Sequence, residues 1–358
     1  MDKTQCDTSV KDLLEKASQT GDLSREEIVA LLSVTNKKDF ARILATADEV
    51  RKAYCGDDVH VRALIEFSNI CIRNCKYCGL RRDNHKVRRY RMPISEIIDT
   101  SIECATMGFG TVVLQSGEDP WFTAERMAHV IREIKRYTNC AVTLCIGEMT
   151  YEEYRTMRQA GADRYLLRHE TATPELYAQL HPDMVFENRL RCLRDLRALG
   201  YQIGAGSMVG LPGQTVADMA DDVVFIKTLD PDMVGIGPFI PHPNTPLGDN
   251  PAGTLDMTLK MVALTRILTR NALIPATTAV GSISPYGREK ALMAGANVVM
   301  VNCTPPRHRV NYEIYPGKQN LQAESSDIFA EIGAWIESIG RKVGSGPGHS
   351  LKLNPQCH

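Results

Sequence analysis

Short apolar runs alternate with longer amphipathic runs along most of the chain, from His60 onward. The short runs are rich in β-branched residues and predict strands, whereas the longer runs place apolar residues at helical spacing. The expected strands cover residues 60–67, 111–115, 141–146, 164–168, 202–209, 233–237, 273–277 and 297–301. The expected helices cover residues 94–107, 124–137, 151–160, 187–199, 216–229, 257–270 and 285–294.

Strands that alternate with helices predict parallel β-α-β units, and eight of them predict an α/β fold of the (β/α)8 barrel type. An open, doubly wound sheet is the alternative that the pattern leaves. Gly108, Gly161, Gly200 and Gly295 each stand just past an amphipathic run, where glycine commonly ends a helix. In a barrel, reactive groups lie just beyond the carboxyl ends of the strands, so we look for the site in the loops that follow them.

We expect three regions along the chain. Residues 1–58 contain three helical runs and predict an extension packed on the outside of the barrel. Residues 59–318 would form the barrel itself. Residues 319–358 predict a C-terminal helix and a flexible tail, because the sequence from Gly340 onward is rich in glycine and proline and indicates a disordered or loosely attached segment.

Composition narrows the class of protein. The chain has 358 residues and a net charge of −1, which gives no reason to expect a nucleic acid or an anionic membrane as partner. We find no secretory signal pattern and no apolar run that approaches the length of a membrane span. Eleven cysteines, an odd number, favour the reducing cytoplasm over a disulfide framework.

The most distinctive chemical feature is the spacing C-x3-C-x2-C formed by Cys71, Cys75 and Cys78, directly after the first expected strand. Thiolates bind iron–sulfur clusters, and three of them on a [4Fe–4S] cubane leave one iron without a protein ligand. Such an open iron can bind the amine and carboxylate of S-adenosylmethionine (SAM), while the ring of Tyr77 can pack beside the adenine. Zinc, which normally takes four ligands, and inert core cysteines are the alternatives.

Further polar residues stand at the ends of the second and third expected strands. Glu118, in the turn after the second strand, can accept a hydrogen bond from the methionine ammonium, unless the turn is purely structural. Thr143 and Cys145 share one face of the third strand, where they can line a site or serve as small core residues.

The fourth strand ends in Leu167-Arg-His-Glu-Thr171, where Arg168 and Glu170 point to the same side. These two residues either contact a ligand or form a simple ion pair. Arg189, in the helix that follows, can bind a carboxylate as a fork or can be an ordinary surface arginine.

The sixth and seventh expected strands supply the last candidates. Met233 begins the sixth strand, and the proline-rich stretch 237–246 after it predicts a fixed wall that carries Ile240. Thr277 and Thr278 end the seventh strand, where they offer hydroxyls to a cavity or are simply good strand formers.

Seven ordered stretches of the chain resemble the [FeFe]-hydrogenase maturase HydE family, in the biotin-synthase-like branch of the radical SAM enzymes. These stretches are residues 65–71, 78–84, 114–120, 162–171, 206–215, 234–243 and 274–279. The cysteine motif alone would identify only the superfamily, whereas the ordered set, which runs from about residue 53 to residue 317, is specific.

The resemblance implies a complete (β/α)8 TIM barrel of radical SAM type around a long internal cavity. It places Glu170 and Arg189 on the cofactor, with Arg189 on its carboxylate. Together with the residues singled out above, the expected cofactor contacts are Tyr77, Glu118, Thr143, Cys145, Glu170, Arg189, Met233 and Ile240. The implied substrate contacts are Gln115, Arg168, Thr277, Thr278, Tyr312 and Tyr315.

The implied activity is reductive cleavage of SAM by a [4Fe–4S] cluster to methionine and a 5′-deoxyadenosyl radical. In the family, the radical acts on a sulfur-containing, organometallic substrate of Fe–CO/CN–cysteine type during assembly of the di-iron subcluster of the hydrogenase H-cluster. The implied partners are companion maturases, namely a tyrosine-cleaving radical enzyme and a GTPase scaffold, and an external electron donor.

One departure from the family pattern matters. Many relatives carry a second cysteine cluster after the Tyr-Pro-Gly turn, but residues 317–329 contain no cysteine, so we expect a single cluster. Other enzyme interpretations are a methylornithine-synthase-like enzyme acting on an amino acid and a biotin-synthase-like sulfur insertion enzyme. Sulfur insertion would need further cluster ligands, yet Cys145 and Cys303 stand singly. An iron–sulfur carrier or scaffold is the non-enzyme alternative.

Overall fold

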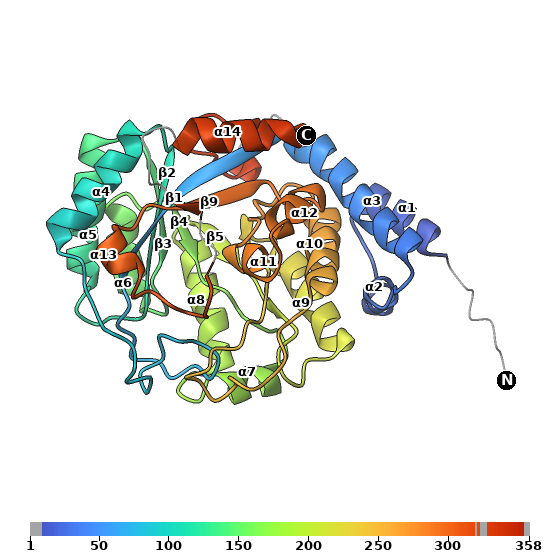
Figure 1. Ribbon diagram of the computed structural model, residues 1–358, viewed down its shortest axis with the longest axis horizontal. Coiled ribbons are helices and arrows are strands. Elements are labelled where there is room, and N and C mark those ends of the chain that lie inside the picture. The colour runs from blue at the N-terminus through green and yellow to red at the C-terminus, as the bar shows by residue number, and fades with distance from the viewer. Residues whose placement is uncertain (1–8, 319–320, 323–327, 354–358) are drawn as a thin grey trace.

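Parallel strands curve around a central core in the computed structural model, which describes residues 9–318, 321–322 and 328–353 (Figure 1). The strands are β1 (Asp58–Ser68), β2 (Thr111–Ser116), β3 (Ala141–Cys145), β4 (Arg164–Leu166), β5 (Gln202–Ala205), β6 (Met208–Val209), β7 (Met233–Val234), β8 (Gly237–Pro238), β9 (Val298–Asn302), β10 (Leu321–Gln322) and β11 (Lys342–Val343). The helices are α1 (Val10–Thr20), α2 (Arg25–Leu32), α3 (Lys37–Cys55), α4 (Ile94–Thr106), α5 (Ala124–Tyr137), α6 (Tyr151–Gln159), α7 (Pro174–Leu180), α8 (Phe186–Ala198), α9 (Val216–Leu229), α10 (Leu255–Thr269), α11 (Thr278–Ile283), α12 (Gly287–Met293), α13 (Pro306–Arg309), α14 (Ile328–Ser338) and the 3-10 helix η1 (Leu351–Leu353).

The main sheet has the strand order β10-β9-β1-β2-β3-β4-β5-β7, with every pairing parallel. The short strands β6 and β8 pair with each other, and β11 pairs with the start of β1. Seven parallel strands, from β9 through β1 to β7, form a curved wall of half-barrel type. The α/β class and the parallel arrangement expected from the alternating pattern are therefore confirmed.

The seventh expected strand, residues 273–277, does not form a regular ladder. Leu273 bridges Met233 and Pro275 bridges Val298, so this segment lies between β7 and β9 through isolated bridges. Proline has no N–H group and interrupts a ladder, which explains why the segment is not a regular strand. The expectation of eight regular strands is thus met only in part.

Two other expected strands are each split by a glycine. Gly206 separates β5 from β6 and has a φ of +153°, and a side chain there would lie 2.0 Å from the carbonyl oxygen of Gly235. Gly235 likewise separates β7 from β8. Glycine at position 206 lets the two backbones approach closely at the carboxyl end of the sheet.

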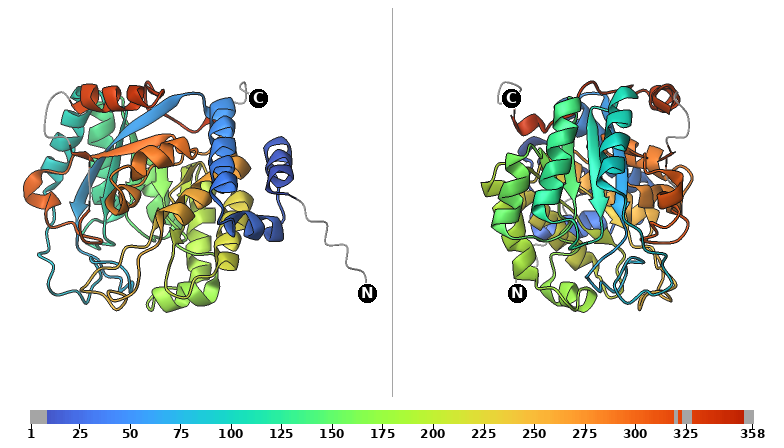
Figure 2. Two further views of the ribbon diagram at one scale, coloured as in Figure 1. Left: turned by 45° about the vertical axis from the view of Figure 1, so that its right-hand side comes forward. Right: turned by 90° about the vertical axis from the view of Figure 1, so that its left-hand side faces the viewer.

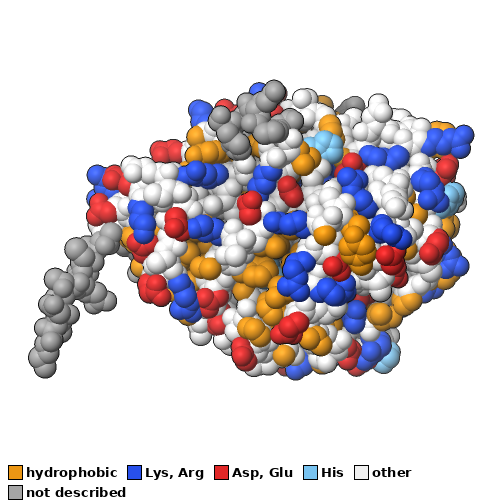
Figure 3. Space-filling model, turned by 180° about the vertical axis from the view of Figure 1, so that it is seen from behind, with side chains coloured by type: hydrophobic (Ala, Val, Ile, Leu, Met, Phe, Trp, Pro, Cys, Tyr) orange, Lys and Arg blue, Asp and Glu red, His pale blue; other side chains and the backbone are white. Residues whose placement is uncertain are grey.

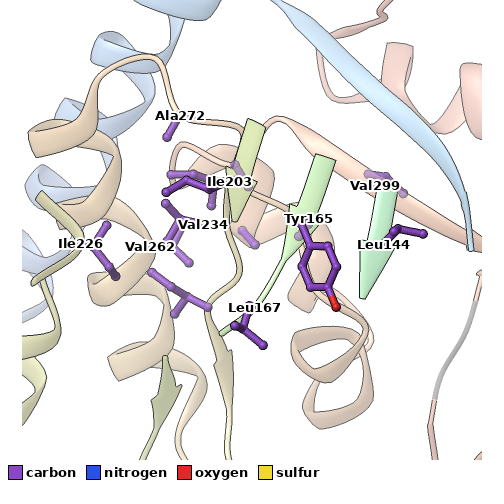
Figure 4. Close-up of a cluster of buried hydrophobic side chains, with 14 of the residues drawn as sticks. Leu144, Tyr165, Leu167, Ile203, Ile226, Val234, Val262, Ala272 and Val299 are labelled. Carbon is purple, nitrogen blue, oxygen red and sulfur yellow. The ribbon is translucent and has the colours of Figure 1, made fainter. Parts of the chain in front are cut away.

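The core lies between the sheet and the helices that cover its outer face. Leu144 and Tyr165 come from neighbouring strands, and Ile226 and Val262 come from α9 and α10, as Figure 4 shows. All four side chains are almost completely buried. Each large aliphatic side chain removed from water contributes roughly 1.5–3 kcal/mol, so this layer holds the helices firmly on the sheet.

Helix ends follow the signals in the sequence. Gly108, Gly161, Gly200 and Gly295 have φ values of +98°, +112°, +76° and +104°, in the left-handed region that glycine adopts readily. At the opposite kind of end, Thr215 and Asp218 form a reciprocal capping box at the start of α9.

Helices α1, α2 and α3 lie on one side of the sheet, beside α9 and α10 (Figure 1). Buried residues of all three helices, such as Leu14, Ile28 and Ile43, belong to the same hydrophobic cluster as the sheet. The division of the chain at residue 58 remains a prediction.

The tail differs from the expected loose attachment as far as it is described. Arg164 donates hydrogen bonds from its Nη2 to the carbonyl oxygens of Pro347, at 2.7 Å, and Gly348, at 2.9 Å. Arg62 also donates to Gly348, at 3.3 Å. Two buried guanidinium groups at the amino-terminal end of the sheet thus find acceptors in the tail backbone, a requirement that composition does not reveal. Residues 354–358 lie outside the described residues.

Long loops gather at the opposite end of the sheet, beyond the carboxyl ends of the strands. Figure 2 shows the segment between β1 and α4 beside the segment between β8 and α10. Gly79 and His242 meet there, since a side chain at Gly79 would lie 2.6 Å from the His242 ring. None of the described helices has both the length and the apolar character required to span a membrane.

Candidate functional site

Two adjoining cavities lie at the carboxyl ends of the strands. The first has a volume of about 200 Å3 and contains the three motif cysteines in its wall; we call it the cysteine chamber. The second has a volume of about 240 Å3 and lies against β1, β2 and the start of α11; we call it the inner chamber. Both chambers are lined by Ser116, Cys145, Leu166, Arg168 and Tyr312, so the two chambers adjoin across these side chains.

The cysteines are positioned by the loop that follows β1. The backbone N–H groups of Arg73 and Glu118 each lie 3.4 Å from the Cys71 sulfur. The backbone N–H of Cys78 donates to the carbonyl oxygen of Cys75, also at 3.4 Å. Burial raises the pKa of all three thiols, that of Cys78 to about 12, so a bound metal has to displace their protons.

The donor set fits a cluster better than a single ion. Within the described residues, no three His, Cys, Asp or Glu side chains converge on a point that one metal ion could occupy. A cubane binds its cysteines at separate iron corners, so its thiolates surround a volume instead of meeting at a point. Three thiols spaced around one chamber have this arrangement, and a cluster of the expected type therefore fits the residues present.

Tyr77 also lines the cysteine chamber, and its ring is held in place by residues that lie outside this chamber. Its hydroxyl lies 3.0 Å from Nε2 of His181, and the two rings meet edge to face. The ring packs against a small apolar cluster formed by residues of α7, β6 and the segments after β6 and β8. A rigid aromatic side chain next to Cys78 suits the expected role of shielding a bound cofactor.

Two ion pairs border the cysteine chamber. Glu118 pairs with Arg73, and burial raises the pKa of its carboxyl despite that partner. Arg189 donates from Nε to Glu148 at 2.7 Å. Although burial opposes its charge, Tyr177 and Glu148 raise the pKa of Arg189, which keeps the guanidinium charged. Glu118 and Arg189 line the chamber as expected, each already engaged by a protein partner.

Arg168 and Glu170 meet at the mouth of β4. Their side chains lie 2.9 Å apart, yet the Nε and Nη2 atoms of Arg168 and Oε2 of Glu170 are buried without an aligned hydrogen bond. Glu170 has a φ of +68°, and its backbone bonds to Gly206 and Met208 hold that conformation. The pair expected from the sequence is present, and its polar atoms retain hydrogen-bonding capacity for a ligand.

The inner chamber contains the other expected substrate contacts. Gln115 donates to the Tyr312 hydroxyl at 3.2 Å, while Tyr315 closes another part of the wall. Thr277 and Thr278 were expected to end a strand. Instead, Thr277 caps α11 and Thr278 is its first residue, and both side chains line the chamber.

Three expected cofactor contacts lie outside both chambers. Thr143 is buried one layer deeper than Cys145 on the same face of β3, and its Oγ1 has no hydrogen-bond partner. Met233 packs against Leu273 and Val298, with its sulfur 3.3 Å from Arg62. Ile240 follows β8 and is not among the lining residues either. A role for these three residues remains a prediction.

Three charged residues of the site were not singled out from the sequence. Glu148 follows β3 directly, so the rule that polar residues after strands line the site could have found it. Glu66 is buried in β1, where it pairs with Lys318 and accepts a hydrogen bond from Asn302 at 2.9 Å. Both Glu66 and Lys318 line the inner chamber, but a charge inside a strand of apolar residues gave no periodic signal.

Comparison with known proteins agrees with this geometry. The family model of the Radical SAM superfamily matches residues 65–226. The chain is 50% identical to the [FeFe] hydrogenase maturase subunit HydE of Thermotoga maritima over 334 residues, which cover 93% of this chain and 95% of that protein. It is 30% identical to the 3-methylornithine synthase of Methanosarcina acetivorans over 287 residues, which cover 80% of this chain and 81% of that protein.

Solved structures show the same architecture. The crystal structure of methylornithine synthase (PylB) superimposes with a TM-score of 0.82 at 26% identity, covering 93% of this chain and 97% of that chain. The [FeFe]-hydrogenase maturase HydG superimposes with a TM-score of 0.79 at 20% identity, covering 95% of this chain and 76% of that chain. The second similarity concerns the fold alone.

Proposed function

The chain belongs to the [FeFe]-hydrogenase maturase HydE family of radical SAM enzymes, and from this premise we propose that it acts on a sulfur-containing substrate of Fe–CO/CN–cysteine type during assembly of the di-iron subcluster of the H-cluster. Family membership implies a [4Fe–4S] cluster and SAM as cofactors. The observation that carries the proposal is that the cysteine chamber adjoins a second chamber lined by Arg168 and by hydroxyl groups.

Cys71, Cys75 and Cys78 would hold the cluster. Bound together, the cluster and SAM supply a one-electron reductive cleavage that yields a carbon-centred radical. Tyr77 packs over one side of the chamber, and Glu118, Glu170 and Arg189 orient the polar groups of SAM. Thr143, Cys145, Met233 and Ile240 complete the proposed cofactor contacts, of which Cys145 lines both chambers.

The inner chamber would take the substrate. Arg168 supplies a positive charge with unused donors, and Gln115, Thr277 and Thr278 supply neutral polar groups. Tyr312 and Tyr315 cover the chamber from the segment after α13. We propose that the bridges at Leu273 and Pro275 complete the barrel, which would exclude water from a reactive radical.

We propose a single cluster, because residues 317–329 contain no cysteine that could bind a second one. Part of that segment lies outside the described residues. Substrate would come from a tyrosine-cleaving companion maturase and product would pass to a GTPase scaffold, while an external donor supplies electrons. The reducing cytoplasm is the proposed location, since a cluster with an open iron is sensitive to oxygen.

The test is the substitution Cys75→Ala, compared with Cys55→Ala as a matched loss of a thiol outside the two chambers. After anaerobic reconstitution, Cys75→Ala should lack the cluster and form no 5′-deoxyadenosine from SAM and dithionite, whereas Cys55→Ala should behave as the wild type. Full cluster content and cleavage in Cys75→Ala would refute the site.

A second candidate is the rearrangement of an amino acid, favoured by the similarity to methylornithine synthase. Hydrogenase activation in vitro separates the two functions. Activation that depends on this protein, at matched amounts of the other maturases, supports the maturase; no dependence, with conversion of lysine instead, supports the alternative.

A further inference from the structure

A strongly basic stretch of chain surrounds the cysteines. Residues 72–91 contain eight Lys or Arg residues and a single acidic residue, Asp83, although the whole chain has a net charge of −1. We call these residues the basic segment. Over most of the face shown in Figure 3, basic and acidic side chains are interspersed. Such a local excess of one sign creates a field that extends beyond the molecular surface.

Part of this charge is used within the protein. Arg89 donates to four backbone carbonyl oxygens, Arg91 pairs with Asp119, and Arg73 pairs with Glu118. The side chains of Lys86 and Arg88 are exposed and have no hydrogen bond or ion pair with any described residue. The structure therefore leaves these two cations without an internal role.

The basic segment contains Cys75 and Cys78, and its later part is hydrogen-bonded back to its beginning next to Cys71. The Arg82 N–H donates to the carbonyl oxygen of Arg73 at 2.8 Å, and its Nη1 donates to that of Ile72 at 3.2 Å. Asn69, two residues before Cys71, donates from Nδ2 to the carbonyl oxygen of Arg88 at 2.9 Å. Charge on this surface thus lies next to the proposed cluster.

Exposed apolar residues adjoin these cations. Ile72, within the basic segment, is 44% exposed, and Val310, after α13, is 75% exposed. Val310 lies close to the basic segment, because the same Asn69 amide donates to the carbonyl oxygen of Asn311 at 2.7 Å. An apolar contact with charged residues around it has the composition of a protein interface.

We infer that the basic segment, together with Val310, is the docking surface for an acidic, low-potential electron-carrier protein. This inference rests on the proposed function, which requires one electron for each cleavage of SAM. The reduced carrier gives one electron to the oxidised cluster, and no bond forms or breaks in this step. Opposite charges speed the encounter, and a small interface lets the carrier leave once oxidised.

The test uses the reconstituted holoenzyme with Lys86→Glu and Arg88→Glu combined. The control combines Lys37→Glu with Lys38→Glu, an equal change of charge at exposed positions at the start of α3. The probe is an acidic ferredoxin. Its association with the enzyme is measured in the oxidised state at low and high ionic strength, and its reduced form then drives 5′-deoxyadenosine formation in parallel with dithionite.

We expect the Lys86/Arg88 variant to bind the ferredoxin at least about tenfold more weakly at low ionic strength and to lose a similar factor in ferredoxin-driven cleavage. The loss should shrink as salt is added, because salt screens exposed charges. Dithionite-driven cleavage should match the wild type, and the control variant should match it in every assay.

Several results would overturn the docking surface. Wild-type ferredoxin binding by the variant is one, and an equal loss with dithionite is another. A defect confined to hydrogenase activation with dithionite would assign the segment to a companion maturase, and salt-sensitive RNA binding lost only in this variant would assign it to nucleic acid. Absence of 5′-deoxyadenosine from the wild type with dithionite would instead refute the proposed function, while the binding assay would still decide the surface.

Discussion

Arg168 stands at the wall that the two chambers share, with a carboxylate partner at ion-pair distance. The Nη2 atom lies 2.9 Å from Glu170, but neither it nor Nε makes an aligned hydrogen bond. A buried guanidinium with unused donors costs free energy unless a ligand completes its bonds. Because its Nε and Nη2 donors have no hydrogen-bond partner, Arg168 is the residue that we expect to bind an anionic substrate.

The substitution Arg168→Lys keeps the charge but removes the planar fork. We expect the apparent affinity for the substrate to fall roughly tenfold, or about 1.4 kcal/mol, while 5′-deoxyadenosine formation without substrate stays unchanged. Titration of hydrogenase activation against substrate, alongside the uncoupled SAM assay, measures both. Equal losses in the two assays would place Arg168 on the cofactor instead.

His60 is a second residue whose environment has a measurable consequence. Burial and the nearby Arg62 guanidinium lower its pKa to about 4. The unfolded chain therefore binds a proton that the folded protein does not, over the range from the ordinary histidine pKa of 6.5 down to about 4. Folding stability due to this group is complete above pH 6.5 and is lost as the pH falls through this range.

The substitution His60→Gln removes the titrating group. Compared with the wild type, the variant should lose less stability between pH 6.5 and pH 4, by an amount on the order of 2 kcal/mol. Urea unfolding across this range measures the difference, in which the carboxylates common to both proteins cancel. If the free energy of unfolding falls equally with decreasing pH in the two proteins, His60 is not held neutral in the folded protein.

Buried side chains of three strands hold the tail element, Gly344 to Ser350, at the amino-terminal end of the sheet. The Arg62 and Arg164 guanidiniums donate to its carbonyl oxygens, and Ser350 donates its N–H to Gln202 at 2.8 Å. A short, glycine-rich segment is fixed in this way by acceptors that it supplies to buried cations. It closes the end of the sheet that lies away from both chambers.

Ending the chain after Val343 should therefore leave two buried cations without their acceptors. We expect a loss of roughly 3 kcal/mol or more in the free energy of unfolding. Ending the chain after Leu353 is the matched control and should cost little, because it keeps every one of these bonds. Chemical denaturation of the two shortened proteins decides between this picture and a loosely attached tail.

Elements differ in how well the sequence predicts them. α4 and α8 were predicted from the spacing of apolar residues and from the glycine that follows each of them, because a helix makes its hydrogen bonds within one segment. The segment at 273–277 was not predicted correctly, since its partners β7 and β9 and the proline at position 275 decide its conformation together. The hydrogen bonds of the tail could not be predicted for the same reason, since they join residues that lie far apart in the chain.

The candidate site shows the same division. The cysteines, Glu118 and Arg168 were found because motif spacing and strand ends are local properties. Glu66 and Lys318 were missed because a buried ion pair across 252 positions leaves no pattern in either segment. Prediction from the sequence therefore finds site residues that a single loop positions. It misses residues that come together only in the folded molecule.

In the whole molecule, the two chambers lie side by side, and we propose separate tasks for them, a separation that can be tested. Thr278 lines the inner chamber and not the cysteine chamber. Replacing it by Phe should fill part of a volume of about 240 Å3 and exclude the substrate while SAM still enters. Thr278→Val is the matched control, because it removes the hydroxyl but keeps the size of the side chain. It therefore separates the effect of added volume from the effect of the lost hydroxyl.

We expect Thr278→Phe to abolish hydrogenase activation and to leave dithionite-driven 5′-deoxyadenosine formation within about twofold of the wild type, a difference of about 0.4 kcal/mol or less in the barrier. Thr278→Val should retain most of both activities if space matters more than the hydroxyl. Because the variant is judged by the ratio of the two activities, a general loss of folding cannot imitate the result. Loss of SAM cleavage in proportion to activation would show that the chambers act as one site, and the assignment of substrate to the inner chamber would be wrong.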